Sequence, residues 1–397
     1  MSALPEGWVE TSLGGVSSSK QYGYTESAST EKVGPKFLRI TDIQHDFIDW
    51  NAVPYCPISE KNKLKYKLGI GDVVIARTGN STGATATIKD ASVDAVFASY
   101  LIRFKIDPQI ADYNFIDFSL RSRRWGGFVK SVKGGSAQGG ANANNFAEYP
   151  INLPPLPEQK AIADMLSSFD EKIELLREQN KTLETLAQTI FKEWFVHFNY
   201  PDATGDMVDS ELGEIPKGWR VGTLRDVVDI FDSKRIPLSS NERQKRQGIY
   251  PYYGATKAMD YIDDYLFDGT YLLMAEDGSV MDDNGYPFLQ YVWGKFWVNN
   301  HTHILQGKNG FSTAALYVFL KRRKVAGIVN GAVQLKINQT NLMGFDMLLP
   351  ADDVMQKFNA LLQPIFEKVK NNSSQVQELS KTRDALLPKL MSGTVRI

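Results

Sequence analysis

The chain carries one set of short motifs twice. The segment Leu4–Trp8 (LPEGW) recurs as Ile215–Trp219 (IPKGW). In the same way, Phe169–Ile173 (FDEKI) recurs as Ile365–Val369 (IFEKV). The copies lie about 200 residues apart, which exceeds the unit of a solenoid repeat and fits a whole module. The repeat therefore predicts two copies of one module in a single polypeptide, an arrangement suited to holding two similar targets at a fixed distance.

Length, cysteine content and charge limit the classes of protein that fit. With 397 residues, the chain is expected to form two or more domains. Its single cysteine, Cys56, rules out a disulfide framework and, with only four histidines, argues against a cysteine-rich zinc site. The first residues lack the features of a signal peptide, and no apolar run approaches the roughly 20 residues of a membrane span, so we expect a cytoplasmic protein. The net charge of −1 argues mildly against nucleic-acid binding through bulk charge, but it is compatible with a local basic face or with a partner that supplies charge.

Each half of the chain is predicted to contain a β-rich domain followed by a long helix. Short β-prone runs, bounded by Gly, Asn and Asp turns, occur at Val73–Ala76, Ser99–Phe104, Tyr271–Met274 and Ala315–Phe319. Pro157 stands near the start of the first helix, where its missing N–H does no harm, and Asp352 or Asp353 is the expected N-cap of the second. The predicted boundaries are a first β-rich domain at 1–155, a helix at 156–198, a linker at 199–211, a second β-rich domain at 212–350, and a second helix with a tail at 351–397.

The two helical segments share a heptad pattern. Seam residues recur at alternating intervals of four and three from Ile162 to Trp194 and from Phe358 to Leu390, and most of them are apolar. Each seam contains one asparagine, Asn180 in the first segment and Asn372 in the second. Because a single polar pair in an apolar seam can fix the alignment of two helices, these residues predict the register.

The predicted register is antiparallel. With Asn180 facing Asn372, every remaining layer pairs apolar residues except the one in which Phe169 faces Arg383. There we expect the guanidinium to stack on the ring. A parallel alignment by repeat equivalence would leave both amides unpaired, so we predict an antiparallel coiled coil with a pseudo-two-fold axis near its middle. Pro364 is expected to kink or restart the second helix. The alternative is two amphipathic helices that pack on their own β-rich domains.

The sequence contains no recognisable catalytic motif. The run Gly79–Gly83 lacks the Lys-Ser/Thr ending of a P-loop, and neither a dinucleotide fingerprint nor a nucleophile elbow occurs. The Asn/Asp-Pro-Pro-Tyr/Phe motif of an amino-methyltransferase is also missing. His301 and His303 could in principle ligate a metal, but without a third ligand nearby we interpret the pair as structural. We therefore expect no active site and no metal site.

Polar loops follow matched strands in the two halves, with different side chains in each copy. Ala76–Gly83 corresponds to Ala275–Ser279, and Lys133–Gln138 corresponds to Val329–Gln334. Arg and Lys suit guanine edges, Asn and Gln suit adenine, and Asp or Glu can accept from cytosine. Taken alone, these loops fit Gly-rich turns, but a constant frame with changed side chains favours DNA reading. The candidate DNA-binding residues are Lys20, Arg77, Thr78, Asn80, Ser81, Lys133, Ser136 and Gln138 in the first half, and Lys234, Arg235, Glu276, Asp277, Asn330 and Gln334 in the second.

Five segments together form a specific pattern: Pro5–Trp8, Pro216–Trp219, Gly71–Gly79, Gly135–Gln138 and Leu153–Ile162. Through these residues, and over essentially its whole length, the chain resembles the DNA-specificity subunit of type I restriction-modification enzymes. The resemblance implies an α+β fold, with two tandem α/β target recognition domains joined by two long helices in an antiparallel coiled coil. It also implies a subunit without catalysis of its own, which docks two adenine-N6 methyltransferase subunits and, on those, ATP-driven restriction and translocase subunits. The second repeat departs from the pattern at Leu349–Asp353, so docking there is expected to use different contacts.

We therefore expect the domain at 1–155 to read one half of a bipartite, asymmetric site in double-stranded DNA, and the domain at 212–350 to read the other. The coiled coil is expected to hold the readers about one to two duplex turns apart. S-adenosylmethionine, ATP and Mg are expected on the partner subunits, with no cofactor on the chain itself. Two alternatives stay open: a scaffold whose β-rich domains hold protein partners, and a stand-alone methyltransferase or nuclease, against which the missing motifs argue.

Overall fold

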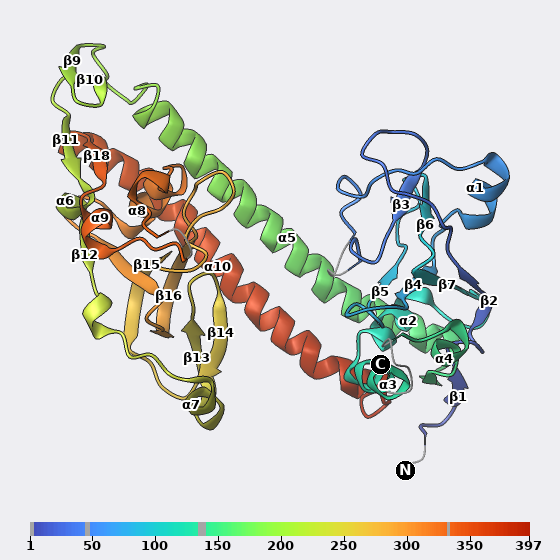
Figure 1. Ribbon diagram of the computed structural model, residues 1–397. Helices are drawn as coiled ribbons and strands as arrows, with labels where there is room; N and C mark the ends of the chain where they lie inside the picture. Colours follow the sequence, from blue (N-terminus) through green and yellow to red (C-terminus); the bar gives the residue numbers. More distant parts are fainter. Residues whose placement is uncertain (1–3, 44–47, 134–139, 332–333) are drawn as a thin grey trace. The chain divides into compact units, whose positions relative to one another are not determined.

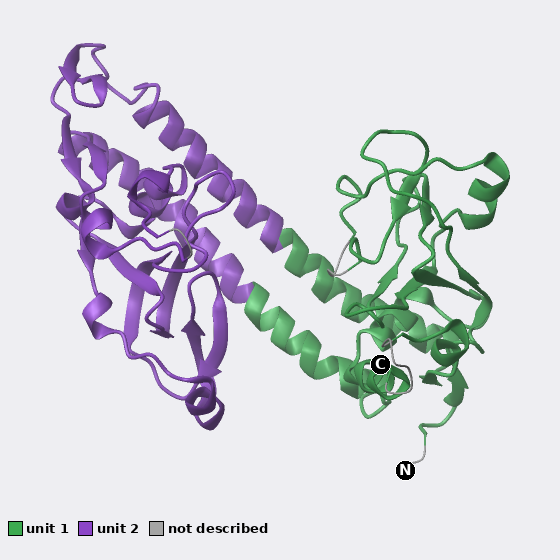
Figure 2. Cartoon of the chain, in the orientation of Figure 1, with its two compact units in different colours: residues 1–175, 376–397 green, residues 176–375 purple. Residues whose placement is uncertain are grey.

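A computed structural model describes residues 4–43, 48–133, 140–331 and 334–397. The chain divides into two compact units (Figure 2). Unit 1 consists of Met1–Leu175 with Val376–Ile397, and unit 2 consists of Leu176–Gln375. Each unit contains β-sheets, short helices and a part of each of two long helices (Figure 1).

Unit 1 is built around a four-stranded antiparallel sheet in the order β2-β7-β4-β5. Its strands are β2 (Ser17–Tyr22), β4 (Asp72–Ala76), β5 (Thr85–Thr87) and β7 (Leu101–Ile106). Two further pairs are β1 (Val9–Ser12) antiparallel to β8 (Pro150–Leu153), and β3 (Lys36–Leu38) parallel to β6 (Ala95–Phe97). The helices are α1 (Glu60–Tyr66), α2 (Tyr113–Leu120), α3 (Arg123–Lys133) and α4 (Ala143–Ala147).

Strand β4 separates two hydrophobic cores of unit 1. Successive side chains of a strand point to opposite faces. Val73 and Ile75 accordingly pack in one core with Phe115 of α2, whereas Val74 packs in another with Phe97 of β6. A strand buried on both faces has a continuous apolar sequence, and this explains why the β-prone run is so clear here. The loop that follows β4 therefore starts from a firmly packed strand.

Unit 2 contains a six-stranded sheet in the order β12-β17-β15-β16-β13-β14. Strands β13 and β16 are parallel, and the other neighbours are antiparallel. The strands are β12 (Val228–Ile230), β13 (Gln247–Tyr253), β14 (Ala258–Ile262), β15 (Phe267–Ala275), β16 (Leu289–Val298) and β17 (Thr302–Gly307), with a separate antiparallel pair of β11 (Arg220–Thr223) and β18 (Asp346–Leu349). The short helices are α6 (Leu224–Val227), η1 (Asp232–Lys234), α7 (Ser240–Lys245), α8 (Thr313–Lys321), η2 (Ala326–Ile328) and α9 (Gln339–Met343).

One segment predicted as a strand is a helix. Ala315–Phe319 lies inside α8, where the hydroxyl of the N-cap Ser312 accepts a hydrogen bond from the backbone N–H of Ala315 over 3.1 Å. Every residue from Ala314 to Leu320 is buried, so the helix has no polar face to mark a 3.6-residue period. A short continuous apolar run fits a buried helix as well as a buried strand, and the strand prediction is wrong for that reason.

The segment predicted as a linker contains regular structure. Strands β9 (Met207–Ser210) and β10 (Gly213–Pro216) form an antiparallel hairpin. Gly213 has a φ of 96° at the start of β10, a conformation that favours glycine. The hairpin leads directly into the second Pro-x-Gly-Trp motif, so part of the predicted linker belongs to the fold of unit 2.

The two long helices are α5 (Leu156–Phe195) and α10 (Asp352–Met391), each of 40 residues. Helix α10 continues through Pro364, so the predicted restart is wrong. Proline removes one backbone hydrogen bond, but its neighbours Leu362 and Ile365 are buried in the core of unit 2. Packing of this turn against the core holds the helix together across the proline.

The predicted register is found in both units, and in each unit the two helices run antiparallel. In unit 2, Asn372 Nδ2 donates to Asn180 Oδ1 over 3.0 Å, and the rings of Trp194 and Phe358 lie 5.7 Å apart between centroids. In unit 1, Leu390 packs in a core with the start of α5, chiefly through Ile162 and Leu166. The cores that contain these seam residues also contain residues of the β-sheets. The helices thus pack on each other and on their β-rich domains at once.

The expected stacking of Arg383 on Phe169 is not the contact that forms. Arg383 Nη1 instead donates to Asp170 Oδ1 over 2.6 Å. A second arginine, Arg121 at the end of α2, donates to Asp170 Oδ2 over 2.7 Å. A carboxylate one residue from the seam is a stronger partner for a guanidinium than a ring face. Asp170 of α5 thus connects Arg383 of α10 with Arg121, which follows α2 in the β-rich part of unit 1.

Candidate nucleic-acid interface

In unit 1, Arg77 and Thr78 open the loop that follows β4. The backbone of Arg77 is fixed on both sides, since its N–H donates to the carbonyl of Tyr100 and its carbonyl accepts from Ala141, each over 3.0 Å. Its guanidinium lies over the ring of Tyr22, 5.0 Å from the centroid, and its buried Nε has no hydrogen-bond partner within the described part of the chain. The terminal nitrogens of Arg77 are therefore held beside an aromatic platform, as suits a side chain that contacts an external ligand.

The rest of this loop is a stiff turn. Thr82 is buried and its hydroxyl donates to the carbonyl of Gly79 over 2.8 Å, while the N–H of Gly83 donates to the carbonyl of Ala76 over 2.8 Å. Gly79 and Gly83 both have positive φ, at 68° and 89°, which few other residues adopt. The turn leaves Asn80 exposed and Ser81 half-buried.

Residues from other elements lie beside this loop. Lys20 on β2 donates from Nζ to Asn144 Oδ1 over 2.7 Å, and Tyr22 accepts at its hydroxyl from the N–H of Ala143. The start of α4 thus contacts the same end of β2 that carries the Arg77 platform. Lys133 is the last residue of α3. The candidates Ser136 and Gln138 lie outside the described residues, so their placement stays a prediction.

In unit 2, three segments that carry candidates come together. Arg235 follows η1 and pairs with Glu276, which directly follows β15. Glu276 is buried and also pairs with Lys336, whose Nζ lies 3.2 Å from Oε1. Asn330 and Lys336 exchange two backbone hydrogen bonds of 2.7 and 2.8 Å. The η1 segment, the end of β15 and the residues Asn330, Lys336 and Ile337 therefore form one site.

The candidates in this site differ in accessibility. Lys234, Asn330 and Gln334 are exposed, and Asp277 is half-buried and bonded to His301 over 2.6 Å. Arg235 and Glu276, by contrast, are engaged inside the protein; Arg235 also donates to the carbonyls of Asp232 and Thr302 over 2.9 Å each. Their ion pair supports a structural role, because breaking it to contact a base would leave a buried charge unpaired.

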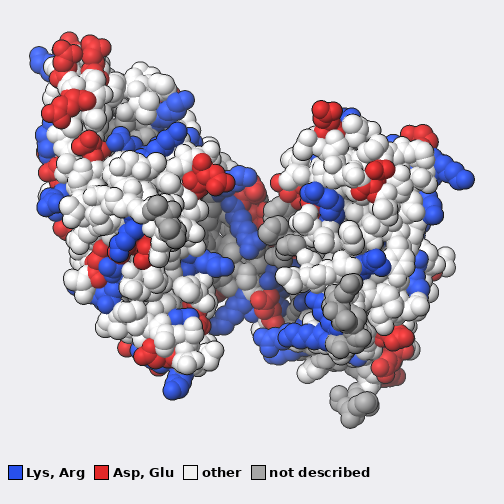
Figure 3. Space-filling view, viewed as in Figure 1, with Lys and Arg blue, Asp and Glu red and all other residues white. Residues whose placement is uncertain are grey.

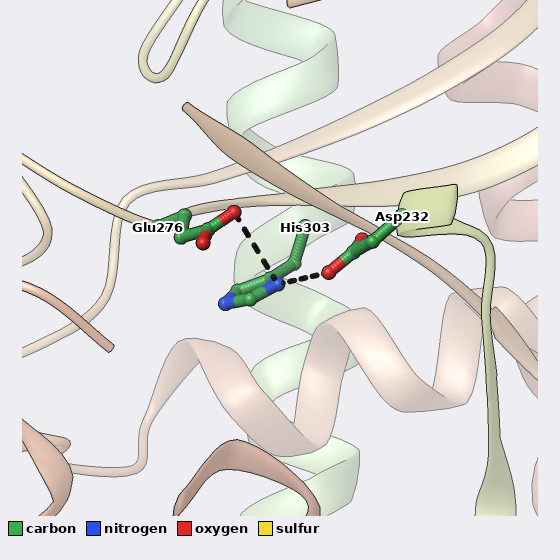
Figure 4. Close-up of side chains that lie close together, drawn as sticks. All are labelled: Asp232, Glu276 and His303. Carbon is green, nitrogen blue, oxygen red and sulfur yellow. Dashed lines mark hydrogen bonds and ion pairs between the residues drawn. The ribbon is translucent and has the colours of Figure 1, made fainter. Parts of the chain in front are cut away.

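The centre of this site is His303, which lies between Asp232 and Glu276 (Figure 4). Its Nδ1 is 2.6 Å from Asp232 Oδ2 and 3.9 Å from Glu276 Oε2. Three such groups could hold a metal ion in principle, but the carboxylates already have cationic partners in Arg235 and Lys336. An added metal ion would have to displace these cations, so the donor set fits a protein-only charge network.

The charges of this network lower the pKa of the Glu276 carboxyl. Burial by itself raises the pKa of Glu276, but the hydrogen bond from Arg235, the charge of His303 and the contact with Lys336 outweigh it, so that pKa lies below its ordinary value. The carboxylate is therefore ionised and holds its cationic partners.

On the face shown in Figure 3, Lys and Arg side chains alternate with Asp and Glu over both units, in keeping with the net charge of −1.

Comparison with known proteins shows what this arrangement belongs to. The model of the family "Type I restriction modification DNA specificity domain" matches residues 5–185 and again residues 216–381. The chain belongs to this family. Among curated relatives, it is 28% identical to the type I restriction enzyme MjaIX specificity subunit of Methanocaldococcus jannaschii, covering 73% of this chain and 70% of that protein. It is 20% identical to the HindI specificity subunit of Haemophilus influenzae, covering 98% of this chain and 99% of that protein.

The fold agrees with a solved member of the same group. The S subunit of the type I restriction-modification system from M. genitalium superposes with a TM-score of 0.59 at 14% identity, covering 98% of this chain and 97% of that chain. The family and the α+β fold class predicted from the sequence are confirmed. Within the described residues, no helix has the length and apolar character needed to cross a membrane.

Sequence reasoning on this DNA specificity chain missed part of the second site. His303 was noted for its spacing from His301, but the two do not share a site, since His301 pairs with Asp277. The carboxylates beside His303 belong to Asp232 and Glu276, which lie 71 and 27 residues earlier in the chain. The expectation that no third metal-ligand residue lies near the histidines is therefore wrong. Local spacing cannot reveal such a cluster, because the sheet assembles it from distant strands.

Proposed function

We propose that the chain reads a bipartite, asymmetric site in double-stranded DNA, with the β-rich domain of unit 1 on one half-site and that of unit 2 on the other. The observation that carries the proposal is the double family match, in which the two copies hold different polar side chains at corresponding places. Unit 1 presents Arg77 and Asn80 after β4, whereas unit 2 presents Asp277 after β15. Since different side chains prefer different base edges, the two half-sites should differ.

We further propose that the chain positions adenine methyltransferase subunits and restriction subunits on that DNA and performs no catalysis itself. Two features support this assignment: the relatives are named specificity subunits, and the sequence lacks the motifs of a methyltransferase or an ATPase. In this proposal S-adenosylmethionine, ATP and Mg bind to the partner subunits. The low net charge fits such an arrangement, because partners can supply positive charge around the DNA.

The decisive experiment is to express the full chain with its methyltransferase subunit in a host that lacks both, and to map N6-methyladenine across the genome. We expect one motif of two unlike half-sites separated by a gap of fixed length. Expression of either component alone should give no such motif. Methylation without a motif, or a motif that persists when this chain is omitted, would exclude the proposal in favour of a protein-binding scaffold.

A further inference from the structure

The imidazole of His303 is enclosed in unit 2 with a hydrogen-bond acceptor on each side. Its side chain is 1% exposed. Nδ1 lies 2.6 Å from Asp232 Oδ2, and Nε2 lies 2.8 Å from the carbonyl oxygen of Ile337. A carbonyl oxygen can only accept, so Nε2 must carry the hydrogen in that bond.

Both ring nitrogens of His303 are therefore engaged in hydrogen bonds. Nε2 donates to Ile337, and Nδ1 is bonded to the Asp232 carboxyl. Asp232 is itself held in place, since its Oδ1 accepts the N–H of Ile304 over 2.9 Å and Arg235 Nη2 lies 3.7 Å from its Oδ2. The ring and its two partners thus belong to one set of connected hydrogen bonds.

The charged groups around the ring form a closed set. Asp232 and Glu276 face His303, and each lies beside Arg235, while Lys336 contacts Glu276 from the other side. Both carboxylates thus have a cationic partner; Arg235 is largely enclosed, whereas the Lys336 side chain is 50% exposed. Such a network rigidifies its surroundings when all members are paired.

Each partner of His303 belongs to a different segment of the candidate site. Asp232 begins η1, which ends at the exposed Lys234. Ile337 closes the segment that carries Asn330 and Gln334, and its N–H donates to the carbonyl of Glu276 over 2.8 Å. One buried ring therefore joins the η1 segment to Ile337 and lies against the end of β15.

We propose that His303 is the positioning residue of the second recognition domain: it fixes the relative placement of the segments that carry Lys234, Asn330 and Gln334, and so determines which bases the second half-site accepts. This inference rests on the proposed function, since it assumes that those segments contact DNA. His303 itself is buried and touches no DNA. Its effect on specificity is indirect and confined to unit 2.

The test uses the full chain with two substitutions and one control. His303→Phe keeps a flat ring and removes both ring nitrogens, whereas His303→Gln keeps an amide that can form one of the two hydrogen bonds. His197→Phe is the matched control, because His197 is exposed and follows α5. Circular dichroism first shows which variants are folded, and His303→Gln carries the test if His303→Phe is not.

The first measurement is hydrogen exchange of the isolated chain, which does not depend on DNA. Peptides that contain the amides of Asn330, Lys336 and Ile337 should exchange about 10- to 100-fold faster in His303→Phe, as expected for the loss of two buried hydrogen bonds. His303→Gln should show a smaller increase, and His197→Phe none. Unchanged exchange in these peptides would overturn the positioning role.

The second measurement is the methylation motif of the complex assembled with the methyltransferase subunit. The His303 variants should accept additional bases in one half-site and keep the other half-site and the gap, with partial recovery in His303→Gln. Faster exchange with an unaltered motif would overturn the specificity role while leaving the proposed function intact. A wild-type complex without a bipartite motif would remove the proposed function and the specificity role together, and exchange would still decide whether His303 holds the segments.

Discussion

The side chains of Asn180 and Asn372 are bonded to each other but are not equivalent. Asn372 Nδ2 donates to Asn180 Oδ1 over 3.0 Å, and Asn180 Nδ2 donates to Ser373 Oγ over 3.0 Å. Asn372 is fully buried, and its Oδ1 has no hydrogen-bond partner among the residues that the structure covers, whereas Asn180 is half-buried. The pair thus combines one satisfied amide with one that is only partly satisfied.

This inequality predicts different costs for the two Asn→Leu substitutions. Asn180→Leu leaves Asn372 buried with only Gln179 as a partner, at 3.3 Å, and should lower the free energy of unfolding by about 1–3 kcal/mol. Asn372→Leu removes the unsatisfied oxygen and should change the free energy of unfolding by less than about 1 kcal/mol. Urea unfolding followed by circular dichroism compares them, and equal losses or the reverse order would contradict the assigned geometry.

Asp170 should be a main stabilising residue of unit 1. Asp170→Ala leaves Arg121 and Arg383 without their shared acceptor, and their side chains are only 26% and 19% exposed. We expect a loss of about 1–3 kcal/mol in the free energy of unfolding. Asp384→Ala is the matched control, since Asp384 contacts Arg383 but is 65% exposed, and it should cost less than about 0.5 kcal/mol. Similar losses from both substitutions would refute the assignment.

The same carboxylate predicts how stability depends on pH. Burial raises the pKa of Asp170, but the hydrogen bonds from Arg121 and Arg383 outweigh burial, and that pKa lies below the ordinary value of 3.8. A depressed pKa gives stability that is present above 3.8 and is lost as the pH falls through the folded-state value. Asp170→Asn should therefore show a flatter loss of stability below about pH 4 than the wild-type chain. Identical slopes in acid titrations followed by fluorescence would exclude this contribution.

Cys56 should be unreactive in the folded chain. Its side chain is buried, and burial, followed by the charge of Glu26, raises the pKa of the thiol to about 11. Because the thiolate is the nucleophile, iodoacetamide at about pH 8 should label the native chain at least tenfold more slowly than the chain in urea. Mass spectrometry measures the labelled fraction. Rapid labelling without denaturant would mean that the core around Cys56 opens readily.

Arg77→Ala tests the candidate with the best-defined setting in unit 1. Truncating an arginine that contacts a base costs roughly 1–3 kcal/mol and relaxes specificity at that position. Binding of the assembled complex to DNA should weaken accordingly, with loss of discrimination in one half-site only. Arg225→Ala, at an exposed arginine on α6, should leave affinity and motif unchanged. An Arg77→Ala complex with wild-type affinity and motif would remove Arg77 from the interface.

The helix pair was predictable to the level of single residues because its signal is periodic and redundant. Many apolar positions agree on one seam, and Asn180 with Asn372 admits one antiparallel alignment. The contacts of Arg383 were missed because Asp170 lies one position from the seam, where heptad reasoning does not look. Pro364 was read from local propensity, which the buried neighbours override.

The β-rich domains were less predictable for two physical reasons. A helix such as α8 that is buried on all sides has no polar face, so its sequence matches that of a buried strand. The network of Asp232, Glu276 and His303 depends on which strands neighbour each other in the sheet, and no local pattern encodes that order. The candidates Arg235, Glu276 and Asn330 do form one connected cluster in unit 2, and their role in DNA binding stays a prediction.

Unit 1 is built from two stretches of the chain that are far apart in the sequence, and this affects the order in which the two units fold during synthesis. Leu390 completes the core around Ile162 and Leu166, with Leu386 and Met391 packed beside it. The ribosome makes these residues only after all of unit 2, which is continuous from Leu176 to Gln375. Domains usually mature from the N-terminus onward. Here unit 2 can complete its core first, because all of its residues are made before Val376. Unit 1 can complete its core only after the last turns of α10 have been made.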